Sequence, residues 1–104
     1  MRERMSAVDT AWLRMDRPNN LMMIVGVLTL SAPVPLSVLR RIVTERMLTF
    51  RRFRQRPLPG PAGALWVDDP VFKVERHVTR IRLAAPGDDA ALKEKVAELA
   101  TRPL

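Results

Sequence analysis

An uncharged stretch from Asn19 to Leu39 restricts most strongly what this 104-residue chain can fold into. Its centre, LMMIVGVL at residues 21–28, carries no polar side chain. Such a run is typical of a strand that is buried on both faces, in the middle of a sheet covered by helices. It is also far shorter than the ~20 residues that a membrane-spanning helix needs. We therefore expect a central strand over residues 21–31, no transmembrane helix and a cytoplasmic protein.

Helix signals lie on both sides of this stretch. Ser6 and Asp9 have the spacing of a capping box, which predicts a short helix that ends at the turn residues RPNN. Residues 36–50 alternate between apolar and charged positions with helical spacing. Towards the end of the chain, Asp88 is a suitable N-cap for a last helix, with Leu92 among its inward residues.

The segment ALWVDDPVFKVERHVTRI, residues 64–81, follows a loop rich in proline and glycine, PLPGPAG. On a strand, Phe72, Val74 and Val78 would share one face, and the polar residues between them would occupy the other. We therefore expect one or two strands in this segment. The order helix, strand, helix, strands, helix predicts an α/β fold, in a single domain over residues 1–104.

The predicted central strand lacks partners in this sequence. A strand with two apolar faces needs neighbours on both edges, and the chain supplies few. The last helix also runs out at TRPL while the pattern of elements is unfinished. We expect the chain to be the opening part of a larger domain that does not fold stably alone.

Composition excludes several kinds of site. The chain has no cysteine and one histidine, which rules out disulfides, thiolate metal sites and any multi-histidine metal site within one copy. Its formal charge of +7 arises from arginine, with fifteen Arg against three Lys. A basic balance fits an anionic partner, and it is equally what a high-GC genome produces, so charge alone does not decide the function.

The candidate catalytic side chains have structural interpretations. His77 is the only histidine of the chain, and a general base would need an orienting partner that Glu75, two residues away on a strand, cannot supply. We interpret His77 as a structural hydrogen-bonding residue. Asp68 and Asp69 resemble a carboxylate pair, but Pro70 forces Asp69 into an extended conformation, so an Asx turn explains both residues.

The run RRFRQR, residues 51–56, is the best argument for nucleic-acid binding. Its arginines could neutralise phosphates while Phe53 stacks on a base. No recognisable nucleic-acid-binding module accompanies it. We favour a solvated strand edge whose charges deter aggregation, and we do not expect nucleic acid as a partner.

Four motifs, in this order and spacing, resemble a known family. They are MSAVDTAWLRMDRPNNLMMIVGVL, FRRFRQR, WVDDPVFKVERHV and the closing TRPL. Together they resemble the N-terminus of the bacterial wax ester synthase/acyl-CoA:diacylglycerol acyltransferase family. The most specific part is WVDDPxFxxxxHV, whose positions here are Trp66, Asp68, Asp69, Pro70, Phe72, His77 and Val78.

The resemblance implies an O-acyltransferase of neutral-lipid synthesis. Members move a fatty acyl group from acyl-CoA, a co-substrate rather than a permanent cofactor, to diacylglycerol or a long-chain alcohol. The implied fold is the N-terminal half of a CoA-dependent acyltransferase, like chloramphenicol acetyltransferase. The family's catalytic motif, HHxxxDG, cannot occur in a chain with one histidine, so no catalytic residue carries over and the seven motif positions are interpreted as structural.

Three hypotheses follow from the sequence. The first is an acyltransferase segment that is inactive alone, in contact with acyl-CoA, with diacylglycerol or fatty alcohol, and at its periphery with a membrane or lipid-droplet surface. The second is a small basic nucleic-acid-binding protein that acts through residues 51–56. The third is a non-catalytic module that docks onto a full-length paralogue or a lipid surface.

Overall fold

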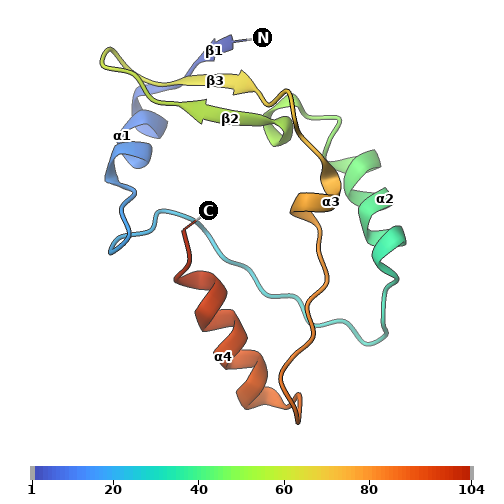
Figure 1. Ribbon diagram of the computed structural model, residues 1–104. Helices are drawn as coiled ribbons and strands as arrows, with labels where there is room; N and C mark the ends of the chain where they lie inside the picture. The colour runs from blue at the N-terminus through green and yellow to red at the C-terminus, as the bar shows by residue number, and fades with distance from the viewer. Residues whose placement is uncertain (1, 104) are drawn as a thin grey trace. The chain divides into compact units, whose positions relative to one another are not determined.

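The computed structural model describes residues 2–103, and it mixes helices with a small sheet (Figure 1). The elements in chain order are β1 (Arg2–Arg4), α1 (Ala7–Met15), α2 (Leu36–Arg46), the 3₁₀ helix η1 (Arg51–Arg54), β2 (Gln55–Leu58), β3 (Leu65–Asp68), α3 (Val74–His77) and α4 (Asp89–Ala100). The chain forms two compact units: one contains the residues up to Ala11 together with Leu30–Arg80, and the other contains Trp12–Thr29 with the residues from Ile81 onwards.

The sheet of the first unit has the strand order β1-β3-β2, and both pairs are antiparallel (Figure 1). Arg2 lies opposite Val67, and Gln55 lies opposite Asp68. The loop between β2 and β3 is the proline- and glycine-rich segment expected from the sequence. Gly63 has a φ of 130° there, a conformation that glycine adopts without steric cost.

The core of the first unit is small. Met5, Thr10, Ala64 and Val67 are the buried side chains among the described residues, and all four belong to this unit. The backbone N–H of Met5 donates to the carbonyl of Ala64 at 2.9 Å, which joins the chain before α1 to the start of β3. The core therefore lies where α1 begins beside the sheet.

The expected strand over residues 21–31 does not form. None of the described backbone hydrogen bonds involves residues 23–34, and the side chains of Ile24 and Leu28 are 99% and 91% exposed. A strand needs a neighbour for its backbone N–H and C=O groups, and the sheet described here ends at β1 and β2. The apolar pattern was therefore misleading about the secondary structure of this segment.

The second correction concerns residues 72–83. The apolar alternation predicted a strand, but Val74–His77 form the short helix α3, and the residues from 78 to 84 adopt no regular secondary structure. Only Leu65–Asp68, at the start of the quoted segment, form a strand. The turn at Asp69 and Pro70 changes the direction of the chain directly after β3, before the apolar alternation of residues 72–83 begins.

Two helix boundaries agree with the sequence. The backbone N–H of Asp9 donates to Oγ of Ser6 at 3.1 Å, which is one half of the expected capping box. In the second unit, α1 ends at a turn closed by reciprocal backbone hydrogen bonds between Arg17 and Asn20, at 3.1 and 2.8 Å. Oδ1 of Asp16 accepts from the N–H of Met22 at 2.9 Å and fixes the exit from that turn.

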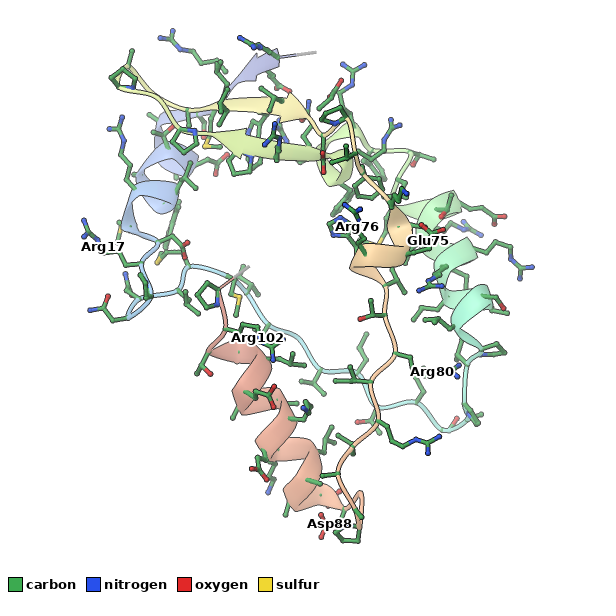
Figure 2. The ribbon with its side chains drawn as sticks, viewed as in Figure 1. Arg17, Glu75, Arg76, Arg80, Asp88 and Arg102 are labelled. Atoms are coloured by element: carbon green, nitrogen blue, oxygen red, sulfur yellow. The ribbon has the colours of Figure 1, made fainter. Side chains whose placement is uncertain are left out.

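Helix α4 carries polar interactions at both ends (Figure 2). Oδ1 of Asp88 accepts from the N–H of Ala91 at 3.0 Å, as an N-cap should. Near the other end, the hydrogen bond and the charge of Lys95, followed by Arg102, hold the pKa of Glu98 below its usual range. Within the described part of the chain, no helix combines the length and the apolar character needed to cross a bilayer.

We predict that Asp88→Ala destabilises the first turn of α4 by about 1 kcal/mol, because the N–H of Ala91 loses its acceptor. Hydrogen exchange at the Ala91 amide should accelerate by roughly fivefold. The matched control is Asp89→Ala, which removes a neighbouring carboxylate that does not cap the helix. Equal acceleration in both variants would show that the cap is not what protects this turn.

Candidate functional site

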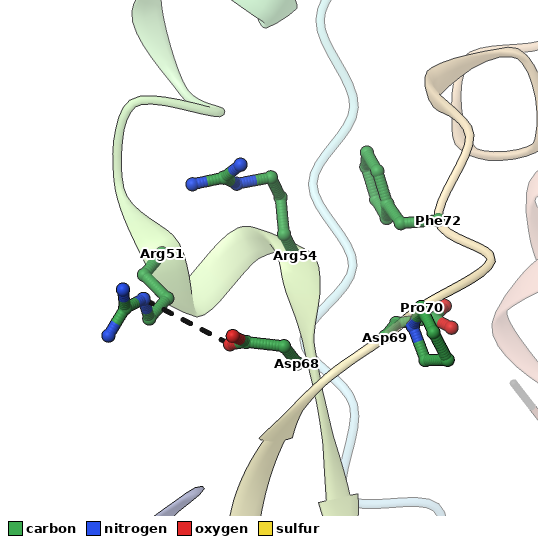
Figure 3. A pocket seen from close by; sticks show the side chains of 6 residues that line it. All are labelled: Arg51, Arg54, Asp68, Asp69, Pro70 and Phe72. Atoms are coloured by element: carbon green, nitrogen blue, oxygen red, sulfur yellow. Dashed lines mark ion pairs between the residues drawn. The ribbon is translucent and has the colours of Figure 1, made fainter. Parts of the chain in front are cut away.

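The motif segment from Trp66 to Val78 borders two adjoining cavities of the first unit. The larger, of about 370 Å³, is lined by Arg51, Arg54, Asp68, Asp69, Pro70 and Phe72 (Figure 3). The smaller, of about 240 Å³, is lined mainly by apolar side chains from α2, η1 and α3. Phe72 lines both, so the charged cavity and the apolar cavity meet at this ring.

Asp68, at the end of β3, is held by two side chains. Oδ1 accepts a hydrogen bond from Nε2 of Gln55, its cross-strand neighbour, at 3.0 Å. The guanidinium Nε of Arg51 lies 4.0 Å from the same oxygen, as the dashed line in Figure 3 marks. The Asp68 carboxylate therefore contacts both the neighbouring strand β2 and a cation, and these contacts fix the end of the sheet.

Asp69 forms the Asx turn that the sequence predicted. Its Oδ1 accepts from the N–H of Val71, two residues on, at 3.1 Å. Its own N–H donates to the carbonyl of Arg54 at 3.0 Å, which ties the turn to η1. Figure 3 shows that Asp69 and Pro70 lie together on the segment that follows β3. The two carboxylates therefore have separate local partners rather than a shared one.

His77 stacks on Phe72. The ring centroids lie 4.8 Å apart and the planes differ by 15°. No hydrogen bond of the His77 ring is described in residues 2–103, so its contact with the rest of the unit is this stack and its place in the lining of the apolar cavity. The sequence placed Phe72 and His77 on opposite faces of a strand, and the short helix α3 brings them together instead.

Arg40 of α2 holds the C-terminal end of the motif. Its Nε donates to the carbonyl of Val78 at 3.0 Å, and Nη2 donates to the carbonyl of Glu75 at 3.4 Å. Glu75 lies in α3 and Val78 is the C-cap that follows it, where the last carbonyls of a helix lack N–H donors within the helix. Arg40 is half-buried, and through these two hydrogen bonds its guanidinium links α2 to α3. Sequence reasoning assigned Arg40 to the charged side of a helix and did not identify this contact.

Trp66 is covered by the guanidinium of Arg52, which lies 4.3 Å from the ring centroid. The same guanidinium pairs with Glu3 of β1, with Nη2 and Oε2 3.1 Å apart, and Nη1 donates to Oε1 of Gln55 at 3.2 Å. A cation placed over an indole face is attracted by the electron density of the ring. Arg52 therefore ties β1 to β2 across the surface of β3.

The run RRFRQR is divided between two elements. Arg51–Arg54 form η1, and Gln55 begins β2, which is an edge of the sheet, as expected for part of the run. Two of its arginines, Arg51 and Arg52, bind acidic side chains of the same unit. Part of the positive charge that suggested a nucleic-acid partner is therefore used within the fold.

Several motif side chains between Trp66 and His77 have a described polar or ring contact. All of these contacts are with neighbours in the same unit. Among residues 2–103, no three His, Cys, Asp or Glu side chains are grouped as metal ligands would be.

Comparison with known proteins gives one family. Residues 5–104 match the wax ester synthase/diacylglycerol acyltransferase catalytic domain. The chain is 33% identical over 107 residues to the probable diacylglycerol O-acyltransferase tgs3 of Mycobacterium tuberculosis, an alignment that covers 97% of this chain and 40% of that protein. It is 43% identical over 65 residues to the probable diacylglycerol O-acyltransferase tgs1 of the same organism, covering 60% of this chain and 14% of tgs1. No solved structure matches the chain significantly.

We predict that Arg40→Met loosens α3 while Arg41→Met, a substitution of its exposed neighbour, does not. Loss of a hydrogen bond from a charged, half-buried donor costs about 1–2 kcal/mol. The measurement is hydrogen exchange at the amide of Val78, which donates to the carbonyl of Val74 at 2.9 Å. If both variants left that amide equally protected, Arg40 would not be what holds α3 to α2.

Proposed function

The chain belongs to the wax ester synthase/diacylglycerol acyltransferase family, and from this premise we propose that it forms the N-terminal part of an O-acyltransferase of neutral-lipid synthesis. The reaction would move a fatty acyl group from acyl-CoA to diacylglycerol or a long-chain alcohol, with CoA released. The match over residues 5–104 carries this proposal. The chain spans 40% of the length of its tgs3 relative, so the activity is proposed for the protein to which this part belongs.

The proposed reaction needs a base that this stretch does not provide. An alcohol is a poor nucleophile until its proton is removed, so the acceptor hydroxyl requires a positioned general base as it attacks the thioester carbonyl. His77, the one histidine, stacks on Phe72 with no described acceptor or carboxylate to orient it. We propose that the base lies outside these residues, and that His77 is a packing residue.

The seven motif positions would then be structural. Trp66, Asp68 and Asp69 bind neighbours on β2 and η1, Phe72 and His77 bind each other, and Val78 binds α2 through Arg40. Such contacts set the position of β3 relative to α2 and α3. We propose that these residues build one part of a single catalytic domain whose architecture is that of a CoA-dependent acyltransferase, with acyl-CoA as co-substrate and a cytoplasmic location.

The scarcity of buried side chains supports the view that this part does not work alone. Four side chains among residues 2–103 are buried. Apolar burial is the main favourable contribution to folding and must offset the conformational entropy of ordering the chain. We propose that the isolated chain neither melts cooperatively nor transfers acyl groups.

The test is a chimera in which this chain replaces the matching segment of tgs3. We expect the chimera to transfer acyl groups from acyl-CoA to diacylglycerol at a rate within about tenfold of the tgs3 rate, a difference of about 1.4 kcal/mol in the barrier. Unmodified tgs3 is the positive control, and the isolated 104-residue chain should give no turnover and no cooperative melt.

Two results would contradict the proposal. A chimera that is folded, by its circular dichroism, but inactive would contradict the acyltransferase function. Turnover by the isolated chain, or a sharp thermal transition, would contradict the claim that this part is a scaffold for chemistry located elsewhere.

A further inference from the structure

Helix α3 is a single turn, and its position depends on contacts from other elements. It covers Val74–His77, and Lys73, its N-cap, forms no side-chain capping hydrogen bond. The first turn of a helix is costly to form, because several residues must be fixed for one hydrogen bond. The residues that bind α3 from outside therefore determine where it lies.

Arg40 supplies such a contact from α2, which lies beside α3 (Figure 1). Its Nε donates to the carbonyl of Val78 at 3.0 Å, and Nη2 donates to the carbonyl of Glu75 at 3.4 Å. The donors of a guanidinium have a fixed planar geometry, so two bonds from one group restrict the orientation of α3 as well as its distance from α2. Arg40 is half-buried, which limits the competition from water for these bonds.

Val78 lies close to the point where the chain leaves the first unit. It is the last position of the motif and the C-cap of α3, and the first unit ends at Arg80. Within the described part of the chain, no backbone hydrogen bond involves residues 79–83. Arg40 therefore holds the last backbone position of the first unit that has a described hydrogen bond.

We propose that Arg40 is a positioning residue of the acyl transfer, a role that rests on the proposed function. It acts through α3: by holding the carbonyl of Val78, it fixes where the chain leaves the first unit for the rest of the domain, which holds the proposed base. A misplacement of about 1 Å can cost about 100-fold in rate even when its origin is far from the chemistry. This role requires no exposed surface, because both hydrogen bonds lie within the first unit.

Stabilisation and positioning predict different kinetics. A contact that only stabilises the fold changes the melting temperature and the fraction of folded molecules, and each folded molecule keeps its kcat. A contact that positions reacting groups changes the kcat of the folded molecules. The KM for acyl-CoA then stays the same, because the lost interaction affects the transition state and not the binding of the substrate.

The test uses the tgs3 chimera that carries this chain, because the proposed function assigns the activity to the whole domain. Circular dichroism gives the melting temperature of each variant. Steady-state kinetics with acyl-CoA and diacylglycerol are then measured well below the lowest of these temperatures. Every variant is fully folded under those conditions, so a change in kcat is not a change in the amount of folded enzyme.

We expect Arg40→Met to lower kcat by about 10- to 100-fold and to leave the KM for acyl-CoA unchanged. Arg40→Lys should give an intermediate kcat, because an ammonium group on a flexible stem cannot bind both carbonyls in a fixed geometry. The matched control, Arg41→Met, removes the same charge from the next, exposed residue of α2 and should keep both constants.

Three results would overturn the proposal. The first is a lower melting temperature for Arg40→Met with an unchanged kcat, which is the effect of a contact that only stabilises the fold. The second is a raised KM with an unchanged kcat. The third is an equal fall in kcat for Arg40→Met and Arg41→Met, which would mean an effect of charge alone.

Arg40→Lys decides the outcome if Arg40→Met does not fold. A lower kcat with an unchanged KM would then support the positioning role, and a kcat equal to that of the unsubstituted chimera would overturn it. The two proposals also fail in different measurements. A folded but inactive unsubstituted chimera would contradict the proposed function and this inference with it, whereas an active chimera whose Arg40 variants keep their kcat would contradict this inference alone.

Discussion

Three arginines from outside the segment 66–78 bind it along its length. Arg52 covers Trp66, Arg51 pairs with Asp68, and Arg40 donates to the carbonyls of Val78 and Glu75. A guanidinium presents several donors in a rigid plane, so one side chain can serve two acceptors on a neighbouring element. With four buried side chains among residues 2–103, the first unit depends on these polar links to a degree that a domain with a larger core would not.

This use of arginine changes how the charge of +7 should be interpreted. Taken as a total, the charge suggested an anionic partner of any kind. Two of the guanidinium groups, those of Arg51 and Arg52, pair with Asp68 and Glu3, so part of this charge is used within the first unit. The distribution of charge within the fold, rather than its sum, therefore has to be considered before a partner is inferred from composition.

The features predicted correctly from the sequence depend on short-range contacts. The Asp88 cap and the Asx turn of Asp69 each join atoms three residues apart or fewer, so local preference determines them. The errors concern partners that are distant in sequence. In the part of the chain described, residues 21–31 have no strand beside them. The segment at α3 is contacted by Arg40, which precedes Val78 by 38 positions. Apolar periodicity cannot specify such partners. The prediction for RRFRQR was correct in part. Its last two residues begin the edge strand β2, as expected, but the 3₁₀ helix η1 formed by Arg51–Arg54 was not predicted.

The central claim is that the motif segment supports an acyltransferase whose base lies elsewhere, and His77 tests it most directly. The measurement is kcat for acyl transfer by the tgs3 chimera with His77→Phe. Phenylalanine can keep the stack on Phe72, a contact of about 0.5–1.5 kcal/mol, so we predict a kcat close to that of the unsubstituted chimera. A fall of about 10²–10⁴-fold, the contribution of a general base, in a variant that remains folded would contradict the account.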